Sequence, residues 1–206
     1  MPTLDMIDTQ LQNHALLEIQ GLLLQNGQPL LNFSGMPTPD PQLLKQCSDK
    51  LISQELNFNR EELRKDHEIY FQGLNIQQRD VYNAVIDSVY NRSGGLYLLY
   101  GHGGTGKTYV WKSICTKLHS EGKIVLPVQS SGIESILLPH GRTAHSRFKI
   151  PIILNEHSTC GIKQGTPEAN LIKQTDLIIW DEPLIMHKFT FEAVDRKLRD
   201  IVGIQC

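Results

Sequence analysis

Cysteine, long apolar runs and net charge are all scarce in this 206-residue sequence. Its longest apolar runs, residues 96–100 and 177–180, are far shorter than the roughly 20 residues of a membrane-spanning helix, which excludes such a helix. The cysteines lie far apart without the short spacings of metal ligands, which excludes a disulfide scaffold or a zinc module and favours a reducing compartment. They are Cys47, Cys115, Cys160 and Cys206.

A targeting segment and a strong charge of either sign are also lacking. The first ten residues are acidic and contain neither an apolar core nor arginine, so we expect neither a secretion signal nor a mitochondrial presequence. The net charge is only −2, but its distribution is uneven. Residues 1–73 carry 5 Lys or Arg against 10 Asp or Glu, whereas residues 74–206 carry 15 against 12. This asymmetry predicts two functional regions divided at residue 73.

The acidic region, residues 1–73, is predicted to be helical with a Pro-rich linker. Residues 11–26 and 59–72 have apolar side chains at helical spacing, and Asn59 with Glu62 forms a capping-box pattern. Between these helices, the run MPTPDP predicts an extended loop. We expect this region to serve packing and linkage rather than chemistry.

Residues 74–206 alternate between helical and strand patterns. This alternation predicts parallel βαβ units, that is, an α/β fold whose parallel sheet is covered on both faces. The last predicted helix also pairs Glu192 with Arg196 and Asp195 with Arg199 at i,i+4 spacing. The predicted strands are residues 96–100, 123–128 and 176–180, and the predicted helices are residues 75–90, 108–119, 131–138 and 187–201.

The strongest motif is the phosphate loop, residues 101–108, which reads GHGGTGKT and matches GxxxxGK[ST] completely. It follows a predicted strand and opens a predicted helix, the context that this motif requires. Its glycines let successive backbone N–H groups converge on phosphate, and the helix N-terminus adds positive potential. Lys107 would place its charge at the β- and γ-phosphates, and the Thr108 hydroxyl would ligate Mg²⁺. The cradle itself comprises Gly101, Gly103, Gly104, Thr105 and Gly106.

A second motif is the acidic pair Asp181-Glu182 at the end of the apolar run LIIW. At the carboxyl edge of a parallel sheet, both carboxylates would lie where the phosphate loop also opens. Asp181 would hold the Mg²⁺ shell and Glu182 would polarise an attacking water, an arrangement that favours hydrolysis over transfer to another acceptor. An apolar run that ends in acids is weak evidence alone and gains its weight from the phosphate loop.

Two interpretations are open for Gln78, just ahead of the first predicted strand. Asn75 and Gln78 have the spacing of a helix capping box, which is a purely structural role. Alternatively, the Gln78 amide reads an adenine edge, as Gln and Asn side chains do when both amide atoms bond the base.

The basic segment, residues 129–149, combines hydroxyl groups and cations and contains no acid after Glu134. Hydroxyls, backbone N–H groups and cations are what a phosphodiester backbone requires, and Phe148 could stack on a base. A solvated basic loop is the structural alternative on composition alone. The cations are Arg142, Arg147 and Lys149.

Taken in order, the runs GHGGTGKT, SSGIESILLPHGRTAHSRFKIP, STCGIKQGTPEANLI and LIIWDEP resemble the Pif-one-type DNA helicases of superfamily one. More narrowly, they resemble the plant-type group related to Helitron transposon helicases. This resemblance covers roughly residues 10–206. It implies a RecA-like domain, Mg-ATP hydrolysis, 5′-to-3′ movement on single-stranded DNA, and roles in repair, recombination and telomere maintenance. It also implies a nuclear protein, which we expect to be monomeric and not bound to membranes.

The resemblance also assigns roles to individual residues. Gln78 matches the adenine-reading glutamine, Gly106, Lys107 and Thr108 match the phosphate loop, and Asp181 with Glu182 matches the acidic motif. The residues that match DNA-contacting motifs, together with the neighbouring arginines, are Ser130, Ser131, Gly132, Arg142, Thr143, His145, Ser146 and Arg147.

Two features depart from the family pattern. Pro183 follows Glu182 directly, where the family usually continues Asp-Glu-Ala-Pro, and proline is expected to restrict Glu182 to extended dihedrals. The sequence also stops at Cys206, so we expect a partial helicase without a second RecA-like domain, poorly active alone.

Two further function classes compete with the helicase. A non-catalytic remnant that holds nucleotide or DNA without turnover is the alternative. A metabolic P-loop kinase is disfavoured, because the segment between the two motifs is basic and rich in hydroxyls rather than an acceptor pocket.

Overall fold

The computed structural model describes most of residues 41–203. The described residues are 12, 15, 16, 19, 23, 30–33, 35–38, 41–132 and 141–203. Most of the predicted helix over residues 11–26, and residues 133–138 of the predicted helix over 131–138, lie outside them. A short 3-10 helix, η1 (Leu30–Asn32), lies in the front part. No helix in the described part of the chain is long and apolar enough to cross a membrane.

Three parallel strands form the sheet, in the order β2-β1-β3. They are β1 (Val125–Gln129), β2 (Arg142–Thr143) and β3 (Leu177–Asp181). β1 is buried along its whole length, because strands on both edges and helices on both faces cover it. The register pairs Gln129 with both Thr143 and Asp181, so the last residues of all three strands lie in one row at the carboxyl edge.

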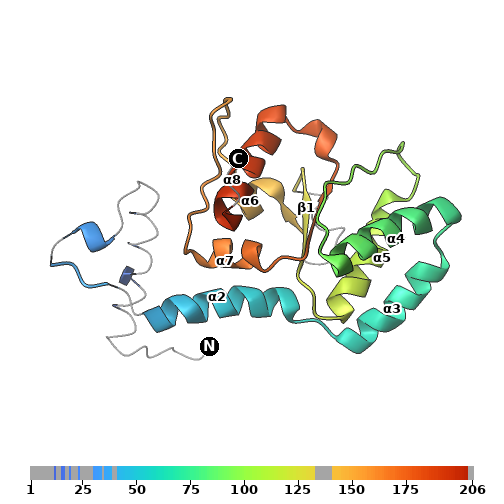
Figure 1. Ribbon diagram of the computed structural model, residues 1–206, viewed down its shortest axis with the longest axis horizontal. Coiled ribbons are helices and arrows are strands. Elements are labelled where there is room, and N and C mark those ends of the chain that lie inside the picture. Colours follow the sequence, from blue (N-terminus) through green and yellow to red (C-terminus); the bar gives the residue numbers. More distant parts are fainter. Residues whose placement is uncertain are drawn as a thin grey trace.

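Helices cover both faces of this sheet, as Figure 1 shows. One face packs against α4 (Ile76–Asn91) and α5 (Lys107–Ser120), with α3 (Arg60–Gln72) packed beside α5. The other face packs against α6 (Ala144–Phe148), α7 (Pro167–Lys173) and α8 (Lys188–Val202). This layering confirms the predicted α/β fold and corresponds to an incomplete RecA-like domain.

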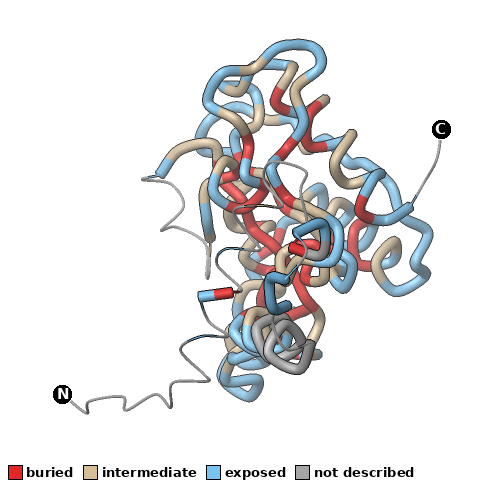
Figure 2. Tube along the Cα trace, turned by 90° about the vertical axis from the view of Figure 1, so that its left-hand side faces the viewer, coloured by how far each residue is buried: buried red, intermediate tan, exposed pale blue. Residues whose placement is uncertain are grey.

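The core consists of apolar side chains from the strands and from the inner faces of these helices. Val125 and Ile179 pack with α4 and α5, whereas Val128 packs with α6 and α8. A smaller cluster joins Leu126 to Ile52 of α2 (Pro41–Leu56). Figure 2 shows the buried positions concentrated in the middle of the molecule. Two helices of the acidic region therefore pack on the rest of the described chain: α2 on α7 and α3 on α5.

The predicted strand over residues 96–100 is wrong, although its neighbours are confirmed to within two residues at each end. The segment forms no strand, and four of its five residues are exposed: Leu96 by 101%, Tyr97 by 51%, Leu98 by 74% and Tyr100 by 76%. The physical reason is that a strand needs a hydrogen-bonded neighbour, and this segment pairs with none of the three described strands.

Three helices have no counterpart among the predictions, namely α2, α6 and α7. α6 and α7 have only five and seven residues, too few for a periodic apolar pattern. Their signals are local instead: Thr143 and Thr166 cap them, and Pro167 occupies the first turn of α7. α2 also begins at a proline, Pro41. Because Pro41 is the last residue of the Pro-rich run MPTPDP, the sequence predicts it as part of the extended loop.

Cys115 and Cys160 are free, buried thiols. Burial raises the pKa of Cys115 to about 12 and that of Cys160 to about 11. Both therefore stay protonated at neutral pH and act as small apolar side chains in the core.

Candidate functional site

The phosphate loop connects the exposed segment 96–100 to the first turn of α5. Two of its glycines have left-handed backbone angles, with φ of 80° at Gly104 and 81° at Gly106. Gly106 is the N-cap of α5, and a Cβ there would lie 2.7 Å from Gln78 Nε2. Glycine is therefore needed at position 106 both for its backbone conformation and for the close approach of α4.

Lys107 is held inside the curve of the loop. Its Nζ donates hydrogen bonds to the Gly101 carbonyl at 2.7 Å and to the His102 carbonyl at 3.1 Å. Thr105 closes the same turn, because its hydroxyl donates to the His102 carbonyl at 2.9 Å. The loop thus brings a cation and the N-terminus of a 14-residue helix to one place, which is the arrangement that binds phosphate.

Thr108 and Asp181 meet although they are far apart in the sequence. The Thr108 hydroxyl donates to Asp181 Oδ2 at 3.4 Å, and the Glu182 N–H donates to Asp181 Oδ1 at 3.2 Å. Asp181 is 7% exposed, so its carboxylate is fixed rather than solvated. Two oxygen ligands of one Mg²⁺ at about 2.1 Å lie about 3 Å apart. The Thr108–Asp181 pair therefore fits a magnesium ion.

Glu182 adopts a conformation that the sequence does not predict. Its φ is 50° and its ψ is 48°, which is left-handed rather than extended, so the prediction made from Pro183 is wrong. Proline disfavours the right-handed helical region for the preceding residue, but the left-handed region stays open, and the 3-10 helix η3 (Pro183–Ile185) starts there. The Ser130 hydroxyl donates to the Glu182 carbonyl at 2.8 Å and helps to hold this turn.

Gln78 uses its two amide atoms for two different contacts. Its Oε1 accepts from the Asn75 N–H at 3.1 Å, and the Asn75 side chain accepts from the Gln78 N–H at 2.9 Å, which confirms the capping box. Its Nε2 donates to the Thr105 carbonyl at 3.1 Å. The structural interpretation is therefore realised, and the same side chain also contacts the phosphate loop.

Two hydroxyls of the basic segment, those of Ser130 and Thr143, are engaged within the fold. Ser130 accepts from Trp180 Nε1 at 3.2 Å, in addition to its bond to Glu182. Thr143 caps α6, because its hydroxyl accepts from the Ser146 N–H at 3.2 Å. Ser131 and Gly132 come two and three residues after the end of β1, so both lie near the carboxyl edge of the sheet.

Arg147 and Phe148 point inward. Arg147 is 5% exposed at its side chain and pairs with Glu55 of α2, also 5% exposed, at 2.7 Å. Burial lowers the pKa of Arg147, although the neighbouring Glu55 opposes that effect. Phe148 is 1% exposed and lies in the core near Trp180, so the predicted stacking on a base is wrong. The cause is the short helix α6, whose inner face carries both side chains.

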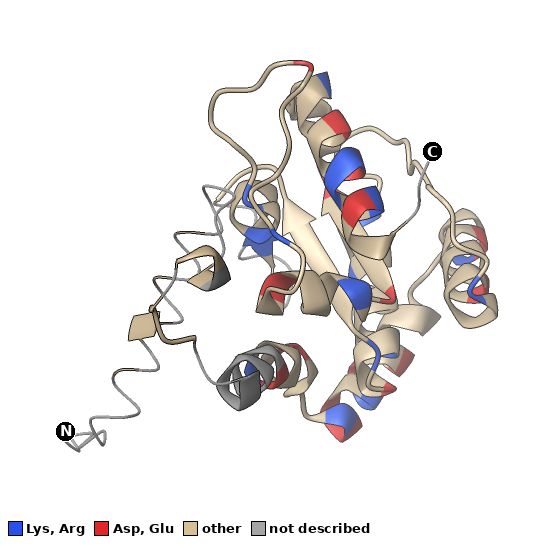
Figure 3. Cartoon of the chain, turned by 60° about the vertical axis from the view of Figure 1, so that its left-hand side comes forward, with Lys and Arg blue, Asp and Glu red and all other residues tan. Residues whose placement is uncertain are grey.

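The remaining cations of the basic segment lie outside. Arg142 is exposed and lines a hollow of about 400 Å³ together with Gln54, Glu55, Asn57 and Gly141. Lys149 is exposed and pairs with Glu168 at 2.6 Å. His145 is half-buried, and Ser146 is exposed on the first turn of α6. Figure 3 shows positive and negative residues interspersed across the helices, so any nucleic-acid contact must depend on a few local groups.

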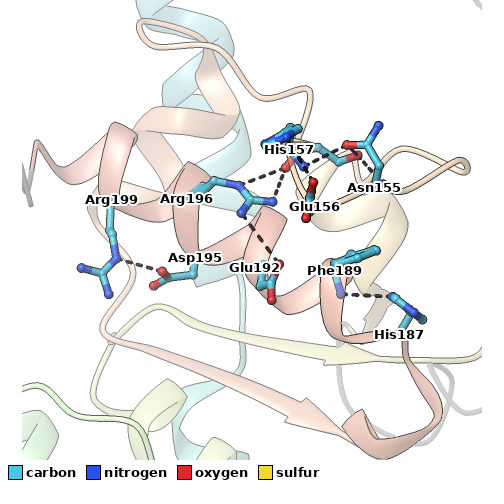
Figure 4. A network of polar contacts seen from close by, with 10 residues as sticks. Asn155, Glu156, His157, His187, Phe189, Glu192, Asp195, Arg196 and Arg199 are labelled. Carbon is cyan, nitrogen blue, oxygen red and sulfur yellow. Dashed lines mark hydrogen bonds and ion pairs between the residues drawn. The ribbon is translucent and has the colours of Figure 1, made fainter.

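The arginines of α8 take part in a network of polar contacts on and beside this helix, as Figure 4 shows. Arg196 donates from Nε and Nη2 to the Ser158 carbonyl, at 3.2 and 2.8 Å, and lies 3.9 Å from Glu192. Arg199 pairs with Asp195 at 2.9 Å. Both predicted i,i+4 pairs are therefore confirmed, and neither arginine lies free to approach the nucleotide site.

Two buried polar residues near the site have no role among the sequence-based predictions. Glu55 gives no local signal, because its partner Arg147 is 92 residues away. Gln129 gives a weak local signal, because it is the single amide in the otherwise apolar strand VLPVQ. It ends that strand at the sheet edge that also carries the acidic motif.

Comparison with known proteins places these features in a family. A family model described as PIF1-like helicase matches residues 73–205. The ATP-dependent DNA helicase PIF4 of Trypanosoma brucei brucei is 27% identical over 135 residues, which is 64% of this chain and 16% of that protein. The ATP-dependent DNA helicase PIF1 of the same organism is 29% identical over 131 residues, 63% of this chain and 12% of that protein. The matched part thus spans less than a fifth of either relative.

Proposed function

We propose that residues 74–206 of this chain, which belongs to the PIF1-like helicase family, form the nucleotide-binding part of an ATP-dependent DNA helicase. The acidic helical region, residues 1–73, would buttress it through α2 and α3. One observation carries this proposal: Lys107 and Thr108 at the start of α5 lie at the same sheet edge as Asp181, with Thr108 and Asp181 in contact. A cation, a helix N-terminus and a hydroxyl–carboxylate pair are together suited to Mg-ATP.

The proposed roles follow from these positions. The glycines of the loop and Thr105 would cradle the phosphates, Lys107 would neutralise them, and Gln78 would steady the loop beside the nucleotide. Thr108 and Asp181 would hold Mg²⁺, whose chemical contribution is to neutralise charge on the transferred phosphoryl group. Glu182, exposed at the turn after β3, would orient the attacking water.

Calorimetry with Mg-ATP tests the nucleotide site. Lys107→Ala should weaken binding by about 10- to 100-fold, since hydrogen bonds to a charged group contribute roughly 1.5–3 kcal/mol. Lys117→Ala is the matched control, because Lys117 lies in the last turns of the same helix and pairs with Glu121 at 2.9 Å. Equal affinity of wild type and Lys107→Ala would sink the proposal.

We also propose that single-stranded DNA crosses the carboxyl edge of the sheet at the basic segment. Ser130, Ser131, Gly132, Thr143, His145 and Ser146 lie along this edge or on the first turn of α6. With Arg147 engaged by Glu55, Arg142 and Lys149 supply the exposed charge. They can neutralise about two phosphates, which predicts a log–log salt slope near −1.4 at about 0.7 per contact.

Binding of a labelled oligonucleotide at several salt concentrations tests this interface. The double variant Arg142→Ala/Lys149→Ala should abolish most of the salt dependence, whereas Arg199→Ala, whose side chain pairs with Asp195 on α8, should leave it unchanged. Retention of the full slope in the double variant would place the DNA elsewhere.

Slow turnover is the expected behaviour of this chain by itself. An arginine placed against the transferred phosphoryl group contributes roughly 10³–10⁵ in rate, and the α8 arginines bond elsewhere. We expect ATP hydrolysis below about 1 s⁻¹, the low end of usual enzyme rates. Because the α8 arginines bond elsewhere, the second candidate function is to bind nucleotide without hydrolysing it. A hydrolysis rate above about 1 s⁻¹ that is abolished in Glu182→Gln would favour the active ATPase instead.

The wider role follows from the family alone. We propose a nuclear protein that acts in DNA repair, recombination or telomere maintenance, by moving on single-stranded DNA as Mg-ATP is hydrolysed. Microscopy of the tagged protein would test the compartment, and a predominantly extranuclear signal would overturn it.

A further inference from the structure

Gln129 is the last residue of β1 and lies in the centre of the carboxyl edge. Its Cα is in register with Thr143 of β2 on one side and with Asp181 of β3 on the other. Adjacent strands lie about 4.8 Å apart, so Gln129 is an immediate neighbour of the carboxylate that fits Mg²⁺. The side chain is fully buried, with 0% exposure.

The Gln129 side chain lies on the same face of the sheet as that of Asp181. Val125 and Ile179 pack with α4 and α5, whereas Val128 packs with the helices on the opposite face. Because side chains alternate along a strand, Gln129 shares the face of Val125, and register partners in a parallel pair share a face as well. This is the face on which the Thr108 hydroxyl reaches Asp181 at 3.4 Å.

Both polar atoms of the Gln129 amide are without a hydrogen-bond partner among the described residues. A buried amide in that state disfavours folding, and an apolar side chain of similar size would be tolerated better. A contribution to folding stability therefore does not explain why a glutamine occupies this buried position. It offers one donor group and one acceptor beside a carboxylate whose Oδ1 is already bonded by the Glu182 N–H.

We propose that Gln129 is a positioning residue of the magnesium–nucleotide site. Its amide would orient the Asp181 carboxylate and the water shell of the ion, since bound Mg²⁺ keeps several waters that both donate and accept. Groups of this kind, one step removed from the metal, typically change metal affinity by 10- to 100-fold. This inference rests on the proposed function, because it presupposes Mg-ATP at Thr108 and Asp181.

Gln129→Met separates this role from a structural one, because methionine retains the length of the side chain and removes the amide. The matched control is Gln174→Met, at an exposed glutamine that precedes β3 and therefore lies toward the opposite edge of the sheet. We expect Gln129→Met to be as resistant to urea as wild type, or more so, in the absence of nucleotide. A clear loss of stability would show that the amide has a partner within the folded chain, and would overturn the inference.

The second readout is ATP affinity by calorimetry, measured with Mg²⁺ and again with EDTA. Gln129→Met should bind 10- to 100-fold more weakly with Mg²⁺ and nearly as well as wild type with EDTA, while Gln174→Met should match wild type in both. Unchanged affinity of Gln129→Met with Mg²⁺, or equal losses in both buffers, would overturn the inference about Gln129. The proposed function would still stand in that case if Lys107→Ala weakens ATP binding. If wild type binds no nucleotide, or binds it independently of Lys107, the proposed function and this inference fail together.

Discussion

The phosphate loop and the basic segment meet at the same sheet edge, yet they use their polar side chains differently. Around the loop, the side chains converge on one small region: Lys107 on the loop carbonyls, Gln78 on Thr105, and Thr108 on Asp181. In the basic segment, several corresponding groups serve the fold. Thr143 caps a helix, Ser130 holds the turn at Glu182, and Arg147 pairs with Glu55.

A motif with fixed spacing therefore predicts the position of its side chains better than a basic composition does. A phosphate loop is defined by residue types at fixed spacing, and the spacing itself dictates the backbone that brings those residues together. A basic composition gives no such geometry, because it does not say on which side of a helix each cation lies.

The largest expected effect concerns the buried pair of Arg147 and Glu55. Glu55→Ala should lower the free energy of unfolding by about 3–5 kcal/mol, because it leaves a buried guanidinium unpaired. Glu168→Ala is the matched control, since its pair with Lys149 is partly exposed and should contribute about 0–1 kcal/mol. Urea denaturation measures both. Similar losses of stability in the two variants would show that the buried pair of Arg147 and Glu55 contributes no more to folding than an exposed ion pair.

A nearly equal loss of stability is expected for a substitution in β3, but not for one in the apolar run of residues 96–100. Ile179→Ala in β3 should cost about 2–5 kcal/mol, because Ile179 is 4% exposed in the core. Leu98→Ala should change stability by less than about 0.5 kcal/mol, because Leu98 is 74% exposed. Urea midpoints of the two variants provide the measurement, and a large loss for Leu98→Ala would show that residues 96–100 are packed after all.

A smaller effect should arise from the glycine at the N-cap of α5. Gly106→Ala must adopt φ near 81° and also displace Gln78 Nε2, which a Cβ would approach to 2.7 Å. Gly165→Ala has a similar φ of 79° but meets no atom within 4 Å, so it carries the backbone strain alone, about 1–2 kcal/mol. We expect Gly106→Ala to be the less stable of the two and to bind ATP more weakly. Equal stability would argue against the contact between α4 and the loop.

The smallest effect is a pH dependence in the helices behind the loop. His67 Nε2 lies 2.8 Å from the hydroxyl of Tyr82, on the helix whose first turn carries Gln78. Burial, reinforced by Lys117, lowers the pKa of His67 below its ordinary value of 6.5. The unfolded chain therefore binds the proton more readily, so stability is full above pH 6.5 and declines as the pH falls toward the lowered pKa.

Urea midpoints at pH 7.5 and at about pH 5.5 test this dependence. His67→Gln should flatten the difference between the two midpoints, whereas His157→Gln, at an exposed histidine, should leave it unchanged. A difference that persists in His67→Gln would assign the titration to another group.

Local patterns in the sequence were sufficient wherever one segment contains its own determinants. The helices over 75–90, 108–119 and 187–201 follow from apolar spacing and caps, and the observed α4, α5 and α8 agree to within one residue at each end. The i,i+4 ion pairs of Glu192 with Arg196 and of Asp195 with Arg199 on α8 follow from spacing for the same reason. Short helices such as α6 and α7 escaped because their signal is a single cap.

The sequence alone predicted the α/β class and the phosphate loop, because residue spacing along the chain fixes both. It only indicated Asp181, through the apolar run that precedes this residue. Only the tertiary structure decided which apolar run becomes a strand. LIIWD pairs along its length with β1, whereas LYLLY, equally apolar, has no described neighbour to bond and lies exposed. It likewise decided that Arg147 faces Glu55 across 92 residues and that Gln129 is buried beside Asp181. A strand and a long-range ion pair each need a partner from elsewhere in the chain, and only the folded arrangement supplies it.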